Sequence, residues 1–250
     1  MCAILVPLLF LLPPGSVALP GDAENRESPD EVLRDQDVTL FYYHIFDMTI
    51  LSLPGSFDFL YSPEDTLSVA NAARRNNYRF VVNGSYFHPD RTHAGFLSID
   101  GRLYSEAMSD IQLTHVVTCD RNDGSIEFLP AGHFTPQPRE GLVEFQTGPL
   151  VIGNDSLCSA AITRSINGQG SYRRTLLAAI DMKHLYLIVV RSPVSLGKLG
   201  EFLLRTTVFS GGRLDVVNLD GGSSVALWSR NFSSINFNAN ARLPILLGVR

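Results

Sequence analysis

The sequence contains no run of basic residues and no basic amphipathic helix. Its 20 Lys and Arg residues are outnumbered by 25 Asp and Glu residues, which gives a formal net charge of −5 at pH 7. A mildly acidic chain of this kind has no electrostatic reason to wrap nucleic acid. A small phosphorylated substrate is compatible with this balance, because a few local arginines can bind it.

The chain also lacks internal repeats, low-complexity tracts and, after its first residues, any long apolar stretch. No later segment approaches the ~20 apolar residues of a membrane-spanning helix. Charged residues make up 18% of the chain and hydrophobic residues 45%. This composition argues against general disorder and favours one large globular domain or at most two small ones.

The first residues have the pattern of a signal peptide. An apolar run from Cys2 to Leu12 is followed by Ser16-Val17-Ala18, small residues at the spacing that a signal peptidase reads. We predict a signal peptide over residues 1–18, cleaved after Ala18, and therefore a secreted or periplasmic protein without stable membrane insertion after cleavage. A buried N-terminal strand is the alternative. Residues 19–37 are polar and are expected to form a flexible linker, so that the domain covers 38–250.

After cleavage two cysteines remain, Cys119 and Cys158. In an oxidising compartment an even number of cysteines favours pairing, and we expect one disulfide between them. Two buried thiols that never meet are the alternative. Two cysteines alone make a poor zinc site, since a structural zinc takes four ligands.

Strand and turn signals dominate the rest of the chain. Several short apolar segments flank turns such as Asp100-Gly101, which predicts hairpins. Two segments have helical signals, 62–75 and 199–209, the first with Ser62 as its expected cap. The βα alternation of a Rossmann fold is absent. We therefore predict an α+β fold with a mostly antiparallel or mixed sheet, two main helices and a single domain.

Four short segments place polar residues beside apolar strands: 83–87 (Asn-Gly-Ser-Tyr-Phe), 147–150 (Thr-Gly-Pro-Leu), 174–175 (Arg-Thr) and 218–224 (Asn-Leu-Asp-Gly-Gly-Ser-Ser). In the last segment an apolar strand delivers Asp220 to its end, and two glycines permit a sharp turn and close approach of a ligand. The N–H groups of residues 221–224 could then point at an anion. Each segment alone is also compatible with an ordinary turn.

Together and in this order, the four segments resemble the phosphodiester glycosidase family, over roughly residues 80–228. That resemblance implies an exported hydrolase that splits the bond between a sugar's anomeric carbon and phosphate, with a sugar phosphodiester or phosphorylated glycan as substrate. Two departures stand out. The family's Asp-Gly-Arg is replaced by Arg191-Ser192-Pro193 after Val190, and the last motif has two glycines where many members have three.

Resemblance and chemistry together suggest roles for these residues. Phosphate is a good leaving group, so one carboxylate could suffice where other glycosidases use two. We expect Asp220 to act as base or nucleophile, Arg174 to clamp the phosphate, and Asn83 to orient the substrate. The expected substrate-binding residues are Gly84, Tyr86, Thr147, Gly148, Gly221, Gly222, Ser223 and Ser224. The scheme requires no metal and no cofactor.

Two other functions remain open from the sequence. A non-catalytic module that binds envelope glycans or their phosphates would keep the glycines and Arg174 without needing an ionised Asp220. A metal-dependent phosphodiesterase could use His88 and His93, which lie in one loop near Asp90. A serine hydrolase is disfavoured, because no Gly-x-Ser-x-Gly elbow is present.

Overall fold

The computed structural model describes residues 26–250 except 54, 138 and 166–167. The predicted signal peptide and the first part of the predicted linker therefore lie outside the described residues. Part of the remaining predicted linker is ordered rather than flexible. Residues Glu31–Asp35 form strand β1, which pairs along its whole length with Val38–Tyr43. We expected the domain to begin at Val38, but regular structure already begins at Glu31.

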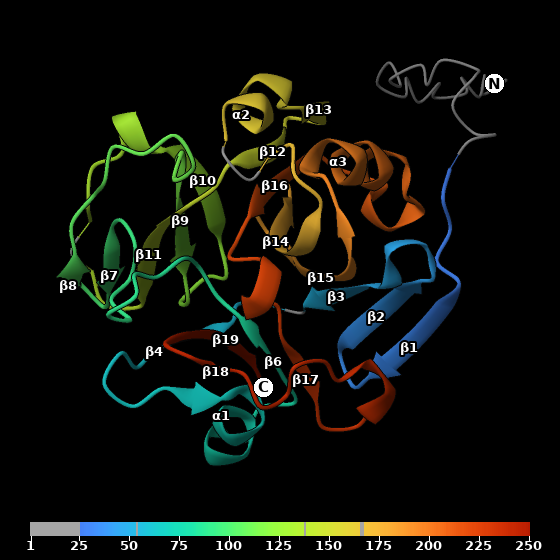
Figure 1. Cartoon of the computed structure of the whole chain (residues 1–250), viewed down its shortest axis with the longest axis horizontal. Helices are drawn as coiled ribbons and strands as arrows, with labels where there is room; N and C mark the ends of the chain where they lie inside the picture. Colours follow the sequence, from blue (N-terminus) through green and yellow to red (C-terminus); the bar gives the residue numbers. More distant parts are fainter. Residues whose placement is uncertain (1–25, 54, 138, 166–167) are drawn as a thin grey trace, which may run out of the picture.

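The largest sheet has eight strands. Its strands, in spatial order, are β1 (Glu31–Asp35), β2 (Val38–Tyr43), β3 (Met48–Leu53), β15 (His184–Val194), β14 (Tyr172–Ile180), β16 (Leu214–Asn218), β12 (Leu150–Gly153) and β13 (Ser156–Leu157). The central strands β14 and β15 are long, and residues 174–180 of β14 and 185–190 of β15 are buried. Helix α3 (Leu196–Arg205) covers one face of this sheet, and the short helix α2 (Ser159–Arg164), between β13 and β14 in the chain, contacts β12 and α3 (Figure 1).

Two smaller sheets and a two-stranded ribbon complete the fold. The five-stranded sheet has the order β10 (Ile126–Pro130), β9 (His115–Asp120), β11 (Leu142–Thr147), β7 (Leu97–Ile99) and β8 (Arg102–Ser105). The four-stranded sheet has the order β17 (Leu227–Ser229), β6 (Phe80–Asn83), β19 (Ile245–Val249) and β4 (Asp58–Tyr61). The ribbon pairs β18 (Arg242–Leu243) with β5 (Leu67–Ser68), next to helix α1 (Val69–Asn76).

The main hydrophobic core lies where the three sheets face one another. It contains Leu177 and Val217 from the eight-stranded sheet, Val117 and Phe145 from the five-stranded sheet, and Leu247 from the four-stranded sheet. A second core packs α3 against the other face of the eight-stranded sheet, and a third packs α1 against the four-stranded sheet. Chain segments that end between the sheets are thus enclosed on several sides, which is where the candidate site lies.

The two longer helices begin at residues that cap them. Ser68 accepts a hydrogen bond from Asn71 N at the start of α1, and Ser195 accepts one from Lys198 N at the start of α3. The expected cap at Ser62 is wrong, because residues 67–68 pair as strand β5 before the helix begins. Both Ser62 and Ser68 are residues that can cap a helix, and the pairing of β5 with β18 determines that Ser68 is used.

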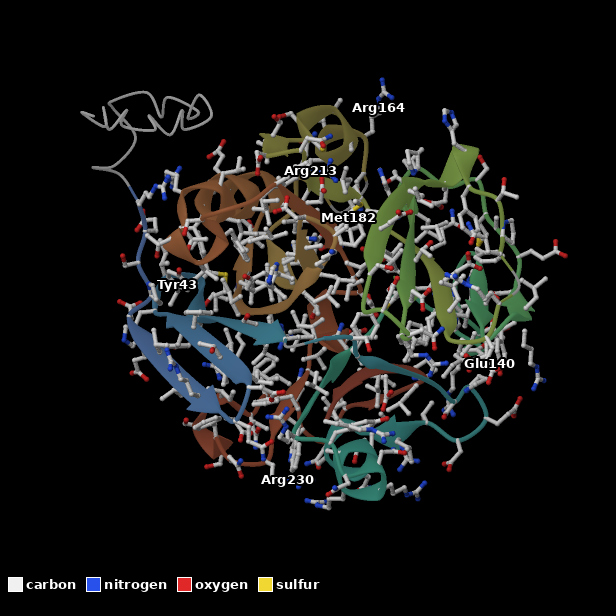
Figure 2. All side chains as sticks on the ribbon, turned by 180° about the vertical axis from the view of Figure 1, so that it is seen from behind. Tyr43, Glu140, Arg164, Met182, Arg213 and Arg230 are labelled. Atoms are coloured by element: carbon white, nitrogen blue, oxygen red, sulfur yellow. The ribbon has the colours of Figure 1, made fainter. Side chains whose placement is uncertain are left out.

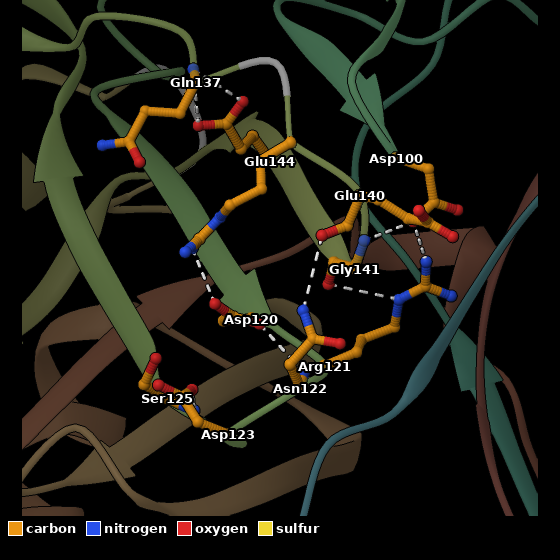
Figure 3. Close-up of polar contacts among 11 residues, drawn as sticks. Asp100, Asp120, Arg121, Asn122, Asp123, Ser125, Gln137, Glu140, Gly141 and Glu144 are labelled. Carbon is orange, nitrogen blue, oxygen red and sulfur yellow. Dashed lines mark hydrogen bonds and ion pairs between the residues drawn. The ribbon is translucent and has the colours of Figure 1, made fainter.

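Short polar contacts fix the turns at one end of the five-stranded sheet (Figure 3). Asp100 forms an ion pair with Arg121 and accepts a hydrogen bond from Gly141 N at 2.8 Å. Asp120 pairs with Arg139 at 2.6 Å. Asp100 lies in the turn between β7 and β8, and Asp120 is the last residue of β9, so these contacts hold that turn, the end of β9 and the segment before β11 together.

The predicted α+β class with mostly antiparallel strands and two main helices is confirmed. All pairings between named strands in the described part of the chain are antiparallel. Among the same residues, helices α1 and α3 are the only two with eight residues or more. None of the helices in the described ranges is long and apolar enough to cross a membrane.

The predicted disulfide is wrong, because Cys119 and Cys158 are both free thiols. Cys119 lies on β9 inside the main core and is fully buried. Cys158 lies in the eight-stranded sheet's edge region, just before α2, and its sulfur is 3.3 Å from the position a Cβ would take on Gly153. The two residues belong to different layers of the fold, so export alone could not bring their sulfurs together.

Candidate active site

The four polar segments meet where strands from different sheets end. Strand β16 belongs to the eight-stranded sheet and β17 to the four-stranded sheet, so residues 219–226 connect two sheets. In Figure 1 this segment runs through the middle of the molecule, between the three sheets. The Asp-Gly-Gly segment is therefore not a hairpin turn, and the same holds for Asn83-Gly84 at the end of β6, since β6 pairs only with β17 and β19.

Asn83 joins three of the segments through its side-chain amide. Its Oδ1 accepts hydrogen bonds from the Thr175 hydroxyl at 2.6 Å and from Ala226 N at 3.1 Å. Its Nδ2 donates to the backbone oxygen of Asp220 at 2.8 Å. Asn83 is only 1% exposed. With its amide occupied on both sides, Asn83 is placed to hold the Asp220 segment rather than to touch a ligand.

The Thr147–Gly148 turn is attached to the end of β16 by a second set of hydrogen bonds. The Thr147 hydroxyl and Gly148 N both donate to the backbone oxygen of Asn218, at 2.8 and 3.1 Å. The Tyr86 hydroxyl donates to Gly148 O at 3.0 Å and accepts from Asn218 Nδ2 at 2.5 Å. All four segments are thus connected into one polar cluster.

Asn218 also has a buried amide oxygen that no described residue contacts with a hydrogen bond. Leaving a buried acceptor unpaired costs about 1–3 kcal/mol. A fold tolerates such a cost when surrounding contacts fix the geometry of the side chain. Here Asn218 Nδ2 donates to Leu219 O at 2.7 Å, which helps to hold the amide in place. The oxygen is therefore an available acceptor in the cluster.

The Asp220 carboxyl lies at the centre of this arrangement. Asp220 N donates to Gly84 O at 3.2 Å, and Asp220 Oδ1 accepts from Gly221 N at 2.8 Å. Burial raises the pKa of Asp220 from 3.8 to about 6, partly opposed by hydrogen bonds from Ser224 and Gly221 N. A carboxylate with such a pKa is still ionised at neutral pH and is a stronger base than an exposed aspartate.

Arg174 is a buried cation whose donors are engaged by the backbone. Its Nε donates to Val194 O at 3.1 Å and a terminal nitrogen donates to Gly170 O at 2.6 Å. The guanidinium also stacks over the Tyr172 ring, 5.2 Å from its centroid. Arg174 is 2% exposed, and burial lowers its pKa below the ordinary value. The prediction that Arg174 clamps a phosphate stays a prediction.

The charges of Asp220 and Arg174 both act on Tyr86. Burial raises the pKa of the Tyr86 hydroxyl above its ordinary value; the Asp220 charge raises it further, while the Arg174 charge lowers it. A negative and a positive group therefore flank one hydroxyl that is held by Asn218 and Gly148. Ionisable groups with perturbed pKa values cluster at functional sites, which makes this cluster a candidate site.

The backbone after Asp220 offers two unpaired donors. Gly221 N is used by the Asp220 carboxylate, and Ser224 N donates to Gly221 O at 3.1 Å. The N–H groups of Gly222 and Ser223, at the start of a 3₁₀ turn, donate to no described residue. The expected anion-binding stretch of four N–H groups is thereby reduced to two.

The glycines of the site are required by close packing. A Cβ on Gly84 would lie 2.4 Å from Ile245 Cγ2, and one on Gly148 would lie 2.3 Å from the backbone oxygen of Gln112. A Cβ on Gly221 would lie 2.8 Å from the backbone oxygen of Arg173. Gly222 has φ of +61° and nothing within 4 Å of its Cβ position. Space excludes a side chain at the first three, and conformation disfavours one at the fourth.

Gln146 is a residue of the site region that the sequence reasoning missed. It is fully buried, and its Oε1 accepts from Phe96 N and Met108 N at 3.0 Å each. Its Nε2 donates to the backbone oxygens of Met108 and Leu113 at 2.7 Å each. Gln146 thus holds both ends of the 108–113 loop against the Thr147–Gly148 turn. The sequence signal that could have identified Gln146 is its place as a polar residue in an apolar strand, directly before Thr-Gly-Pro.

The alternative catalytic groups lie outside this cluster. His93 is 1% exposed, its Nδ1 is bonded to Gly95 O at 3.1 Å, and burial lowers its pKa to about 4. Asp90 bonds to Thr92 in the same loop. Glu144 is buried on the opposite face of β11, where both carboxylate oxygens accept from Gln137 N (Figure 3). No group of three or more potential metal ligands occurs within the described residues.

Comparison with known proteins agrees with this geometry. A family model described as phosphodiester glycosidase matches residues 76–249. The chain belongs to the phosphodiester glycosidase family. The match includes all four segments of the polar cluster, from Asn83 to Ser224. It confirms the resemblance that those segments suggested. No curated protein matches the chain in a sequence comparison.

Several solved structures, among them the following two, are similar to this chain. The catalytic domain of zebrafish N-acetylglucosamine-1-phosphodiester alpha-N-acetylglucosaminidase, auto-inhibited by its pro-peptide, has a TM-score of 0.61 at 15% identity, covering 88% of this chain and 81% of that one. A protein from Burkholderia pseudomallei described as exported has a TM-score of 0.50 at 10% identity, covering 84% and 74%. At identities of 15% and 10%, the similarity shows that this phosphodiester glycosidase family member shares its fold with the two proteins and shows nothing more.

Proposed function

We propose that this protein hydrolyses the bond between the anomeric carbon of a sugar and phosphate in a sugar phosphodiester. Family membership supports this reaction class. The observation that carries it is the half-buried Asp220 carboxyl, with a pKa raised to about 6, in a cluster assembled from all four family segments. The zebrafish enzyme with the same fold acts, by its description, on an N-acetylglucosamine 1-phosphodiester.

Ionised Asp220 is the group that starts the reaction. Acting as a base, it takes a proton from water, whose oxygen attacks the anomeric carbon. Acting as a nucleophile, it forms a bond to that carbon itself, and water later breaks it. In both courses the bond from the anomeric carbon to the phosphate oxygen breaks, and the electron pair leaves with the phosphate. A phosphate monoester and a free sugar are the products.

The leaving phosphate gains charge as the bond breaks. We propose that Arg174 and the N–H groups of Gly222 and Ser223 stabilise that charge. Arg174 would act chiefly through its buried positive charge, since two of its donors are bonded to backbone oxygens. Interactions that strengthen as the charge develops lower the barrier more than they favour ground-state binding.

Asn83 is proposed to position Asp220 rather than to touch the substrate, because its amide is bonded to Thr175, Ala226 N and Asp220 O. Tyr86, Thr147 and Gly148 would shape the substrate pocket together with Gly84. Their mutual hydrogen bonds keep the strand ends at fixed separations, which a site needs in order to orient its substrate.

We further propose that the protein is exported. The apolar run before Ser16-Val17-Ala18 supports this, and the Burkholderia protein of the same fold is described as exported. N-terminal sequencing of protein from the native host tests it. A chain beginning near Leu19 is expected, whereas an intact Met1 on soluble cytosolic protein would end the idea.

The experiment that tests the activity is turnover of a chromogenic sugar phosphodiester by the purified protein, with and without a chelator. Release of free sugar and of the phosphate monoester of the chromogenic alcohol, unchanged by the chelator, is expected. A module that only binds envelope glycans or phosphates would bind the substrate without turnover. Loss of activity with the chelator would favour a metal-dependent reaction instead.

A further inference from the structure

A cavity lies between the β9–β10 hairpin and the eight-stranded sheet. It has a volume of about 410 Å³, within the range of about 300–1,000 Å³ that is usual for small-molecule sites. Figure 2 shows two of its lining residues, Met182 and Arg213, on the side of the eight-stranded sheet that faces the hairpin. The catalytic Asp220 is not among the residues that line it.

The floor of the cavity is apolar. It includes Ile126, which is 1% exposed, Ala179, which is 3% exposed, and Leu150. These residues belong to the main core or pack against it. The floor is therefore rigid, and an apolar face of a ligand laid on it would be removed from water.

The wall of the cavity carries hydrogen-bonding groups that the protein does not fully use. His115 bonds through Nδ1 to the Thr114 hydroxyl at 2.9 Å, and no described residue bonds to its Nε2. The carboxylate of Glu127 and the side-chain amide of Asn154 have no partner among the described residues either. Only Nε of the Arg213 guanidinium is engaged, at 3.4 Å from Asp215.

The backbone of β10 adds two more groups. Strand β10 is the edge of its sheet and pairs only with β9. Ile126 N points away from β9, because it donates to Met182 O at 3.0 Å. Backbone groups alternate in direction along an antiparallel edge. The N–H and C=O of Phe128 therefore face the cavity as well.

The charges of the wall select against an anion. Two carboxylates, from Glu127 and Asp215, are opposed by the single guanidinium of Arg213. Burial lowers the pKa of His115, so this ring is neutral at neutral pH. A ligand with an apolar face, many hydroxyls and no charge fits such a cavity. A sugar ring has that chemistry, with C–H groups on its faces and hydroxyls at its edge.

We propose that this cavity is a binding site for a neutral saccharide, separate from the Asp220 site. The two sites lie toward opposite ends of β16, with Asn218 at the catalytic end and Asp215 three residues away, which spans about 10 Å along a strand. The distance is short enough for one glycan chain to reach from one site to the other. The proposal does not rest on the proposed activity, since binding here needs no turnover.

Backbone amide NMR of the wild-type protein tests it, because the saccharide probes contain no phosphodiester for the proposed reaction to cleave. The probes are maltotriose, cellotriose and N,N′,N″-triacetylchitotriose. Each is titrated up to about 10 mM, which is about tenfold above a Kd of about 1 mM for a weak ligand. At least one should shift the amides of Ile126, Phe128 and Asn154. Inorganic phosphate should leave those three amides unchanged.

A double variant, Glu127→Ala with Arg213→Ala, should weaken binding of that saccharide about tenfold, as expected when two hydrogen-bonding side chains are lost. Both residues lie near the surface, and an unchanged melting temperature would confirm the fold. Arg164→Ala is the matched control, because this side chain projects from α2 away from the cavity (Figure 2). It should leave the affinity within twofold.

Three results would overturn the proposal. The first is the absence of shifts with all three saccharides. The second is a set of shifts confined to residues 221–224, which would place the saccharide at the catalytic cluster. The third is unchanged affinity in the double variant.

Discussion

Replacing Asp220 by Asn should abolish activity and, above pH 6, make the folded protein more stable. Under the proposed function, this half-buried carboxylate is retained for its chemistry at a cost to the stability of the fold. Asparagine has nearly the same size and keeps an oxygen that can accept the 2.8 Å hydrogen bond from Gly221 N. It has no charge to remove from water, so the variant separates the chemical role of Asp220 from its structural contacts.

The size of the effect follows from the pKa of Asp220. A rise from 3.8 to about 6 corresponds to about 3 kcal/mol that disfavours the ionised folded state. Because the residue keeps some contact with solvent, we expect about 2 kcal/mol. Well below pH 3.8 the carboxyl is protonated in the folded and unfolded states, and no difference arises. Between pH 4 and 6 the unfolded chain ionises first, so the wild-type protein loses stability there.

Urea unfolding of wild type and Asp220→Asn at pH 4 and pH 7.5 measures this difference. The variant should gain about 2 kcal/mol at pH 7.5 and little at pH 4. Asp215→Asn, on the strand β16 that precedes Asp220 in the chain, is the matched control. Its carboxylate accepts from Asn154 N at 2.8 Å and pairs with Arg213, so this variant should gain no stability. Equal or lower stability of Asp220→Asn at pH 7.5 would refute the reasoning.

Other predictions concern the backbone after Asp220, the buried cation and the thiols. Gly221→Ala should cost about 2 kcal/mol of stability and most of the activity, because its Cβ would lie 2.8 Å from a backbone oxygen. Gly222→Ala meets no atom within 4 Å and should cost only about 1 kcal/mol through its positive φ; urea unfolding of both variants decides, and equal losses would contradict the packing argument. Arg174→Ala should lower the melting temperature and kcat/KM together, by leaving buried carbonyls without donors, and Arg174→Lys should restore only part of each; wild-type kinetics in the alanine variant would remove its charge from the mechanism. A thiol reagent should modify half-exposed Cys158 in the folded protein and Cys119 only after unfolding, since burial raises the pKa of Cys119 to about 12; no free thiol in the unfolded, unreduced mature chain would restore the disulfide.

The features that the sequence could predict are local or depend on an ordered set of motifs. The hairpin at Asp100-Gly101 is set by its turn residues, and it forms as β7 and β8. The four polar segments were expected to act together, and their hydrogen bonds connect them through Asn83 and Tyr86. Residues at the ends of apolar strands are informative, because a polar group there needs a partner.

The features that were missed depend on distant parts of the chain. Strand β1 (Glu31–Asp35) is a mostly exposed edge whose sequence is polar, and only its pairing with β2 makes it a strand. The predicted disulfide was wrong because the spacing of Cys119 and Cys158 in the sequence does not show in which layers of the fold they lie. The engaged donors of Arg174 could not be foreseen either, since they bond to Gly170 and Val194 in other parts of the fold.

Phosphorus NMR of the products formed from a panel of sugar phosphodiesters tests the central claim most directly. The wild-type protein should convert at least one member of the panel to the phosphate monoester of the second alcohol, with free sugar released. Asp220→Asn should give no product from the same compound. Formation of a sugar 1-phosphate would mean cleavage on the other side of the phosphorus, and product from Asp220→Asn at the wild-type rate would remove Asp220 from the reaction. Either result would contradict the account.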